Sequence, residues 1–190
     1  GSGLDYWVYA LSVYDGKLVA GGSFTTAGGV AARSIAAWDG LSWSALGSGM
    51  AGSPPFGSGT VRALTVYDGK LIAGGQFTTA GGVSASYIAA WDGLSWSTLG
   101  SGMDFWVLAL TVYDNKLIAG GEFATAGGVV ARCIAAWNGS SWSALGSGMN
   151  SEVRALAVYV TKLWAGRSFT PADDAAANNI AAWGGACWSA

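Results

Sequence analysis

The stretch Tyr67-Asp68-Gly69-Lys70-Leu71-Ile72-Ala73-Gly74-Gly75-Gln76-Phe77 decides the fold, because the chain repeats it. Related stretches run from Tyr14 to Phe24, from Tyr113 to Phe123 and, in a more divergent form, from Tyr159 to Phe169. The phenylalanines that close these stretches are spaced by 53, 46 and 46 residues, so the period is 46 residues. A fixed period of this length is typical of proteins built from stacked structural repeats.

The sequence divides into four predicted repeat units, residues 1–46, 47–99, 100–145 and 146–190. The second unit is longer by seven residues, and we predict the insertion at Ala51–Gly57. The fourth unit diverges most, and Gly166-Arg167 replaces its Gly-Gly pair. Terminal repeats often differ because they face water or another partner. Neutral drift is the alternative explanation.

Each unit contains four segments with strand character. In the second unit, residues 61–67 are mostly apolar and rich in β-branched residues, which favours a buried strand. Asp68-Gly69 then predicts a two-residue hairpin turn, because both central residues of a type I′ turn need positive φ. The remaining predicted elements are a strand at 70–77, a loop at 78–86, a strand at 87–91, a turn at 92–95 and a strand at 96–99. One unit is therefore a four-stranded antiparallel meander.

Such a meander cannot bury its apolar faces alone, and twisted four-stranded units usually stack radially into a β-propeller. The pattern resembles kelch-type blades in its apolar strand Leu71–Gly75, its turn Asp92-Gly93 and the residues Trp91, Trp96 and Leu99. The phrases IAAWDG, SWSALGSGM and VYDGKL are more similar to the propeller repeats of bacterial surface proteins and of fungal cortical polarity-marker proteins. This resemblance covers the whole chain. It implies an all-β propeller with four blades per chain and a parent protein that is extracellular or at the cell surface.

Composition narrows the function classes. Only 11% of the residues are charged and the net charge is −2, so no basic face is available for nucleic acid. No apolar run approaches the roughly 20 residues that span a bilayer, which argues against membrane insertion. The absence of histidine removes the Ser-His-Asp constellation and most zinc and copper sites. We therefore predict no enzyme, no metal and no cofactor.

The aromatic residues are the feature of the sequence that suggests a ligand-binding role. Eight of the 11 tryptophans occur two per unit and are predicted to pack structurally. Outside that register, aromatic residues precede the first strand of units one and three, whereas arginine lies near the start of this strand in units two and four. Exposed Trp and Tyr beside Arg suit stacking on sugars or a protein contact, although these rings could instead fill space between blades. The candidate ligand-binding residues are Tyr6, Trp7, Arg62, Phe105, Trp106 and Arg154.

Four stacked units leave two large apolar blade faces, which a soluble protein must cover. Kelch-like propellers usually have six or more blades, so we expect two chains to pair head to tail into an eight-bladed homodimeric ring. A closed ring of four blades and a different ring size are the alternatives.

Two function classes follow. The first is a non-catalytic scaffold or interaction module made of recently amplified blades, which is either a natural fragment or an engineered excision of a longer repeat protein. The alternative is a carbohydrate-binding, lectin-like propeller that uses the aromatic residues. The sequence leaves open whether Cys133 and Cys187 pair, and we expect two buried free thiols.

Overall fold

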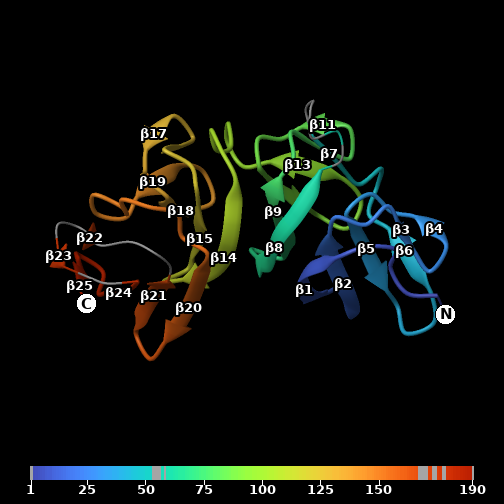
Figure 1. The fold of residues 1–190 in the computed structure, drawn as a ribbon, viewed down its shortest axis with the longest axis horizontal. Coiled ribbons are helices and arrows are strands. Elements are labelled where there is room, and N and C mark those ends of the chain that lie inside the picture. Colours follow the sequence, from blue (N-terminus) through green and yellow to red (C-terminus); the bar gives the residue numbers. More distant parts are fainter. Residues whose placement is uncertain are drawn as a thin grey trace. The chain divides into compact units, whose positions relative to one another are not determined.

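The computed structural model describes residues 2–52, 57, 59–166, 171–172, 175–176 and 179–189. The chain divides into two compact structural units, each made of two of the four sequence repeats. They are Gly1–Leu99, called unit 1 from here on, and Gly100–Ala190, called unit 2. Each unit contains two four-stranded sheets, which we call blades 1 and 2 in unit 1 and blades 3 and 4 in unit 2 (Figure 1). Residues 53–56 of the predicted insertion and Arg167 lie outside the described residues.

Unit 1 contains two antiparallel meanders. The strands of blade 1 are β1 (Val8–Tyr14), β2 (Lys17–Gly22), β5 (Ile35–Trp38) and β6 (Trp43–Ala45), hydrogen-bonded in that order. The strands of blade 2 are β8 (Thr60–Tyr67), β9 (Lys70–Gln76), β12 (Ile88–Trp91) and β13 (Trp96–Thr98), again in chain order. The prediction of four-stranded antiparallel sheets is confirmed.

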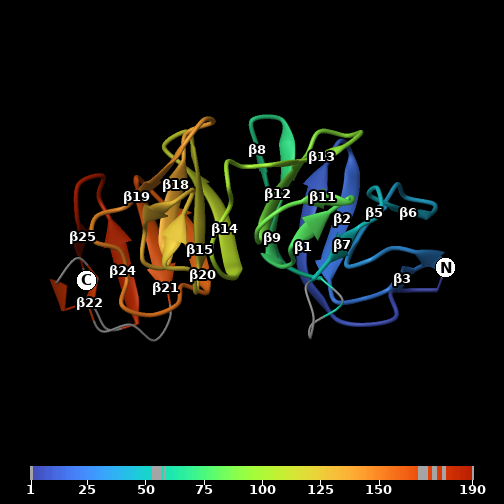
Figure 2. The same cartoon turned by 90° about the horizontal axis from the view of Figure 1, so that it is seen from above.

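Unit 2 repeats this arrangement. The strands of blade 3 are β14 (Val107–Tyr113), β15 (Lys116–Gly121), β18 (Ile134–Trp137) and β19 (Trp142–Ala144). The strands of blade 4 are β20 (Ala155–Tyr159), β21 (Lys162–Gly166), β24 (Ile180–Trp183) and β25 (Trp188–Ser189). Within each unit the first strands of the two blades are neighbours, β1 beside β8 and β14 beside β20 (Figure 2).

The turn between the first and second strands has the predicted geometry. Asp68 and Gly69 have φ values of 49° and 69°, so both central residues lie in the left-handed region that a type I′ turn requires. In blade 4 the corresponding turn holds Val160, whose φ is 57°. A β-branched residue is unfavourable in this region, so the divergent fourth repeat, which forms blade 4, keeps the turn at a conformational cost.

The loop predicted at residues 78–86 is a short hairpin instead. Strands β10 (Thr79–Ala80) and β11 (Val83–Ser84) pair with each other, and β10 also pairs with β7 (Met50–Ala51). Gly81 and Gly82 form its turn, with φ values of 59° and 85°. The other blades carry the same hairpin as β3 (Thr26–Ala27) with β4 (Val30–Ala31), β16 (Thr125–Ala126) with β17 (Val129–Val130), and β22 (Pro171–Ala172) with β23 (Ala175–Ala176).

The core of each unit lies between its two blades. In unit 1, Val19 and Ile35 of blade 1 pack in one buried cluster with Val61 and Leu71 of blade 2. In unit 2 the corresponding positions of blades 3 and 4 form a second cluster. Full burial of one such aliphatic side chain contributes about 1.5–3 kcal/mol. Stacking of blades therefore stabilises each unit, and in unit 1 a smaller buried cluster around Phe24 and Ala27 adds to it within blade 1 and its hairpin.

Glycine at the end of the second strand lets neighbouring blades approach. A Cβ atom at Gly120 of blade 3 would lie 2.7 Å from Cγ1 of Val153 in blade 4. A Cβ atom at the next residue, Gly121, would collide with the carbonyl oxygen of Trp106 in its own blade. Each glycine of the pair therefore makes room for a different neighbour, the first for the adjacent blade and the second for the backbone.

Candidate binding surface

In blades 1 and 3, the segment that precedes the first strand lies against the short hairpin of the same blade. In unit 1, the carboxylate of Asp5 accepts hydrogen bonds from the backbone N–H of Thr25 at 2.8 Å and of Thr26 at 3.0 Å. A hydrogen bond from the Thr25 hydroxyl, followed by these backbone bonds, lowers the pKa of Asp5 to about 2. In unit 2, Asp104 accepts from the N–H groups of Ala124 and Thr125, both at 2.9 Å. We call the surface made by these segments and hairpins the loop face.

On the loop face of unit 1, the candidate residues Tyr6, Trp7 and Arg62 belong to one row of contacts. The rings of Tyr6 and Trp7 stack with centroids 4.9 Å apart, and Trp7 meets Tyr9 edge to face at 6.2 Å. The guanidinium carbon of Arg62 lies 4.1 Å from the centre of the Tyr9 ring, a cation–π contact. Tyr6 and Trp7 are 56% and 63% exposed, so the first two rings of the row are open to a ligand.

Sequence reasoning missed Tyr9, the residue that joins the aromatic rings to Arg62. Tyr9 and Arg62 are 53 residues apart and occupy the same position in successive repeats. Because the first strands of blades 1 and 2 are neighbours, equal positions come together. The contact between Tyr9 and Arg62 could therefore have been predicted from their equivalent positions in successive repeats.

A hollow of about 590 Å³ opens on the loop face of unit 1. Its described lining includes the hairpin residues Thr25 and Thr26 and the exposed Arg33. The guanidinium of Arg33 can donate hydrogen bonds to a polar ligand there, whereas the threonine side chains already bond Asp5.

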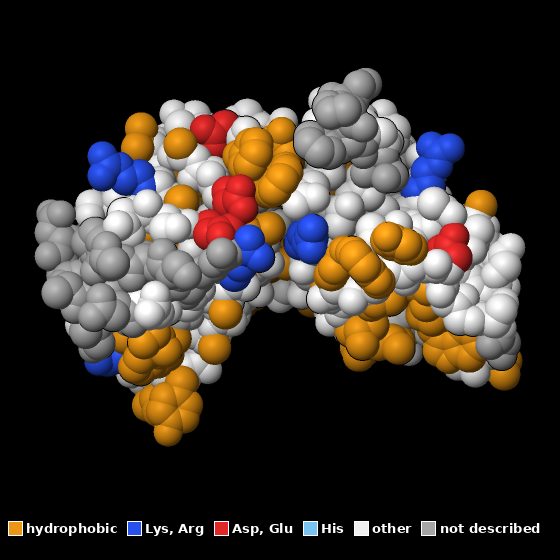
Figure 3. Space-filling view, in the orientation of Figure 1, with side chains coloured by type: hydrophobic (Ala, Val, Ile, Leu, Met, Phe, Trp, Pro, Cys, Tyr) orange, Lys and Arg blue, Asp and Glu red, His pale blue; other side chains and the backbone are white. Residues whose placement is uncertain are grey.

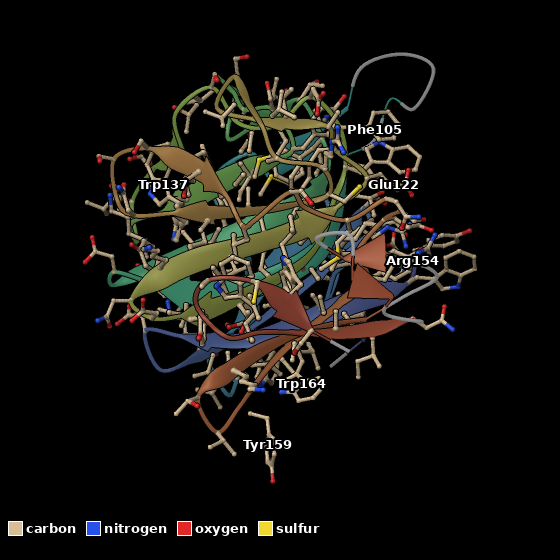
Figure 4. All side chains as sticks on the ribbon, turned by 90° about the vertical axis from the view of Figure 1, so that its left-hand side faces the viewer. Phe105, Glu122, Trp137, Arg154, Tyr159 and Trp164 are labelled. Atoms are coloured by element: carbon tan, nitrogen blue, oxygen red, sulfur yellow. The ribbon has the colours of Figure 1, made fainter. Side chains whose placement is uncertain are left out.

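On the loop face of unit 2, Phe105 and Trp106 stack with ring centroids 4.6 Å apart and an interplanar angle of 20°. Phe105 is exposed, and Trp106 is half-buried. Arg154 does not repeat the contact of Arg62, because blade 3 has Leu108 at the position of Tyr9. The guanidinium of Arg154 forms an ion pair with Glu152 at 3.1 Å. Phe105, Glu122 and Arg154 lie on one side of unit 2, and Trp137 lies on the opposite side (Figure 4).

Acidic groups in unit 2 change the electrostatics of the loop face. The hydrogen bond between the side chains of Glu122 and Glu152, followed by burial and by the charge of Glu152, raises the pKa of Glu122 to about 6. Burial, together with the charges of Glu122, Glu152 and Asp104, raises the pKa of the Cys133 thiol to about 11. This thiol is therefore protonated at neutral pH and is a poor nucleophile. Figure 3 shows acidic and basic side chains next to one another on unit 2, among apolar patches.

Both cysteines are free thiols, but the expectation that both are buried is wrong. Cys133 is half-buried beside the core of unit 2, whereas Cys187 is exposed in the turn before β25. The turn position explains the exposure, since the equivalent residues of the other repeats are serines.

The turns at the other ends of the strands form a second surface. In unit 2 the hydroxyl of Tyr113 donates a hydrogen bond to the carbonyl oxygen of Thr161 at 2.9 Å, which joins blade 3 to blade 4. In unit 1 the equivalent Tyr14 lines a groove of about 420 Å³ with Asp15 and Asp92. Burial, followed by the charges of these two carboxylates, raises the pKa of Tyr14.

Two blade faces expose residues that are buried in the equivalent positions of other blades. Leu18 of blade 1 is 38% exposed, whereas Leu71 of blade 2, at the same repeat position, is 0% exposed. In blade 4, Ile180 is 53% exposed, whereas the equivalent Ile134 of blade 3 is 0% exposed in the core of unit 2. Blade 1 and blade 4 thus each have apolar residues that are typical of a blade interface, but these residues are exposed.

Within the described ranges, no group of three or more Cys, Asp or Glu side chains is arranged to hold a metal ion. The same part of the chain contains no helix that is long and apolar enough to cross a membrane.

Comparison with known proteins agrees with a propeller. A family model described as a β-propeller domain of unknown function (DUF5122) matches residues 15–36 and 68–89, which lie in blades 1 and 2. No curated protein matches the chain.

Among solved structures, the computationally designed Ika8 protein is 20% identical, with a TM-score of 0.54, and the match covers 93% of this chain and 45% of Ika8. The computationally designed Ika4 protein is 18% identical, with a TM-score of 0.55, and the match covers 96% of this chain and 93% of Ika4. The WD40 β-propeller domain of Doa1 is 16% identical, with a TM-score of 0.45, over 88% of this chain and 64% of that one. The sheets, their order and the family match together show a chain built from β-propeller repeats.

Proposed function

We propose that this chain is a non-catalytic propeller scaffold, made of kelch-like, recently amplified blades, whose two uncovered blade faces associate with a second copy. Head-to-tail pairing of two chains gives an eight-bladed ring. The chain is then a natural fragment or an engineered excision of a longer repeat protein.

The main observation that supports this proposal is the exposure of Leu18 on blade 1. Its equivalents Leu71 and Leu163 are each 0% exposed, and each packs in a core cluster that includes residues of the preceding blade. Blade 1 presents the same apolar position, and the exposed Ile180 of blade 4 occupies the position that Ile134 uses inside unit 2. A second copy of this chain offers the matching face, because every repeat has the apolar residues of both sides of a blade interface.

Light scattering coupled to size-exclusion chromatography tests the association. We expect a mass of two 19.2 kDa chains for the wild type and of one chain for Leu18→Glu, because a buried unpaired carboxylate is unfavourable. The matched control is Leu41→Glu at a turn, where the leucine is already almost fully exposed, and it stays at the mass of two chains. Circular dichroism checks that both variants fold. A wild-type mass of one chain contradicts the dimer and favours a four-bladed ring, and a larger multiple favours another ring size.

A carbohydrate-binding role is the second candidate, favoured by two features of the loop face of unit 1: the exposed, stacked pair Tyr6–Trp7 and the hollow lined by Thr25 and Arg33. Aromatic faces stack on sugar rings, and the neighbouring polar groups bind hydroxyls. On unit 2, Phe105, Trp106 and Arg154 are the corresponding candidates.

A glycan array tests this role with Trp7→Ala and Trp106→Ala. The control is Tyr159→Ala, which removes an exposed ring that lies away from Phe105, Glu122 and Arg154 (Figure 4). We expect any glycan signal to fall at least tenfold in the tryptophan variants and to persist in the control. Absence of glycan binding by the wild type at millimolar concentration rejects the lectin role and leaves a protein as the partner of this surface.

A further inference from the structure

The chain contains two glutamates, Glu122 and Glu152, and the fold brings them together across the junction between blades 3 and 4. Glu122 directly follows β15, and its backbone N–H donates to the carbonyl oxygen of Trp106 at 3.0 Å. Glu152 directly precedes Val153, whose side chain is fully buried and whose N–H donates to the carbonyl oxygen of Gly121 at 3.0 Å. Each glutamate is therefore adjacent to one end of the same bond between blades.

The side chains of Glu122 and Glu152 are hydrogen-bonded to one another. Two carboxylates cannot form such a bond, because both are acceptors when ionised, so one of the two must carry the proton. Glu152 is held in place, since its side chain is only 14% exposed and pairs with Arg154 at 3.1 Å. Arg154 offsets one negative charge but not two.

The groups that face this pair come from both blades. Blade 3 supplies Cys133, whose carbonyl oxygen accepts from the N–H of Gly121 at 2.9 Å, and the carboxylate of Asp104. Blade 4 supplies Arg154, the one cation that we find acting on Glu122 within the described residues. Asp104 adds further negative charge to the surroundings, so ionisation of both glutamates concentrates like charges at the junction.

We propose that Glu122 and Glu152 form a proton-dependent latch, which holds the loop face of blades 3 and 4 together while one carboxyl is protonated and loosens it when both ionise. Unit 1 provides the neutral counterpart, because Ser23 and Thr60 occupy the two equivalent positions.

The pH range follows from the raised pKa of Glu122. A carboxyl whose pKa is higher in the folded state than its ordinary 4.5 binds more protons when folded, so the latch contributes fully below pH 4.5. Its contribution is lost as the pH rises through about 6, the pKa of Glu122 in the structure. The junction should therefore be tighter in mildly acidic solution than at neutral pH.

Selective ¹³C labelling of glutamate carboxyls tests the shared proton directly, because only two signals arise. We expect one signal to titrate with a midpoint about 6 in the wild type and to return to about 4.5 in Glu152→Gln, where the negative charge of the neighbour is gone. Two independent titrations near 4.5 in the wild type overturn the proposal.

Amide hydrogen exchange at pH 5.5 and 7.5, corrected for the intrinsic rate, tests the loosening. We expect protection of the Val153 amide to fall by about fourfold at the higher pH, because a carboxyl with a pKa of about 6 when the latch is closed and 4.5 when it is open is only partly protonated at pH 5.5. Ser23, whose N–H donates to Trp7 as that of Glu122 donates to Trp106, serves as the internal reference and keeps its protection.

The double variant Glu122→Gln, Glu152→Gln provides the matched control. Its two amides form a hydrogen bond without a shared proton, so protection of Val153 should be equal at both pH values. Equal protection in the wild type, or the same fall in the double variant, overturns the latch. Either result is independent of whether the chain is a monomer or a dimer, because the contact lies within unit 2.

Discussion

The indole Nε1 of Trp96 donates a hydrogen bond to the backbone carbonyl oxygen of Leu46 at 3.0 Å, and this bond joins blade 2 to blade 1. Trp188 of blade 4 makes the equivalent bond to Leu145, also at 3.0 Å. Both indoles are nearly fully buried, so each bond satisfies two polar groups that water cannot reach. In blades 2 and 4 the tryptophan of the fourth strand therefore fastens the blade to the one before it, in addition to filling space.

Trp96→Phe should lower the free energy of unfolding of the chain by about 1 kcal/mol, because it keeps an aromatic ring but removes the indole donor and leaves the carbonyl oxygen of Leu46 only the longer bond from the N–H of Gly49 at 3.3 Å. Trp43→Phe is the matched control, since Trp43 holds the same position in blade 1 and its indole has no acceptor among the described residues. Urea denaturation measures both. An equal loss in the two variants would show that ring size, and not the hydrogen bond, stabilises the position.

Gly120→Ala should destabilise the chain by about 1–3 kcal/mol, because its methyl group would collide with Val153 of the adjacent blade. Gly166→Ala at the equivalent position of blade 4 should be nearly neutral, since the nearest described atom would be Cβ of Ala155 at 3.6 Å. Thermal unfolding of the two variants provides the comparison. If both are tolerated, the Gly-Gly pair is not required by blade packing.

The strands could be predicted from the sequence because their signals are local. The predicted strand at 61–67 differs by one residue from β8, and the Asp68-Gly69 turn is correct in type. The short hairpin within 78–86 was missed because two-residue strands show no measurable periodicity. Its turn could nevertheless have been predicted, because Gly81-Gly82 lies between two short segments and a Gly-Gly pair in that setting is typical of a hairpin.

The candidate surface was predictable only in part. Tyr6 and Trp7 are adjacent in sequence, so their common location on a loop needed no knowledge of the fold. The contacts of Arg62 with Tyr9 and of Glu122 with Glu152 depend on which residues of successive blades face one another. That register is set by blade packing, through the burial of Val61 and Val153, and no local pattern encodes it.

Val160→Asn should raise the free energy of unfolding by about 1 kcal/mol, because asparagine tolerates the positive φ of 57° far better than a β-branched residue. The control is Val158→Asn in the adjacent strand β20, where the loss of a β-branched residue should destabilise the sheet instead. Urea denaturation distinguishes the two signs. A loss of stability in Val160→Asn would mean that contacts of the valine side chain outweigh the strain of its backbone.

Cys187 should react with iodoacetamide at pH 8 at least tenfold faster than Cys133. Cys187 is exposed, whereas the thiol of Cys133 is half-buried and its pKa of about 11 leaves little thiolate at this pH. Mass spectrometry of the alkylated peptides measures both rates in one sample, so Cys187 serves as the internal control. The rate at Cys133 should rise steeply between pH 8 and 10 and, if the nearby carboxylates hold its pKa up, should be higher in the variant Glu122→Gln, Glu152→Gln. Equal rates at the two cysteines in the wild type would contradict the burial and charge environment that the structure gives to Cys133.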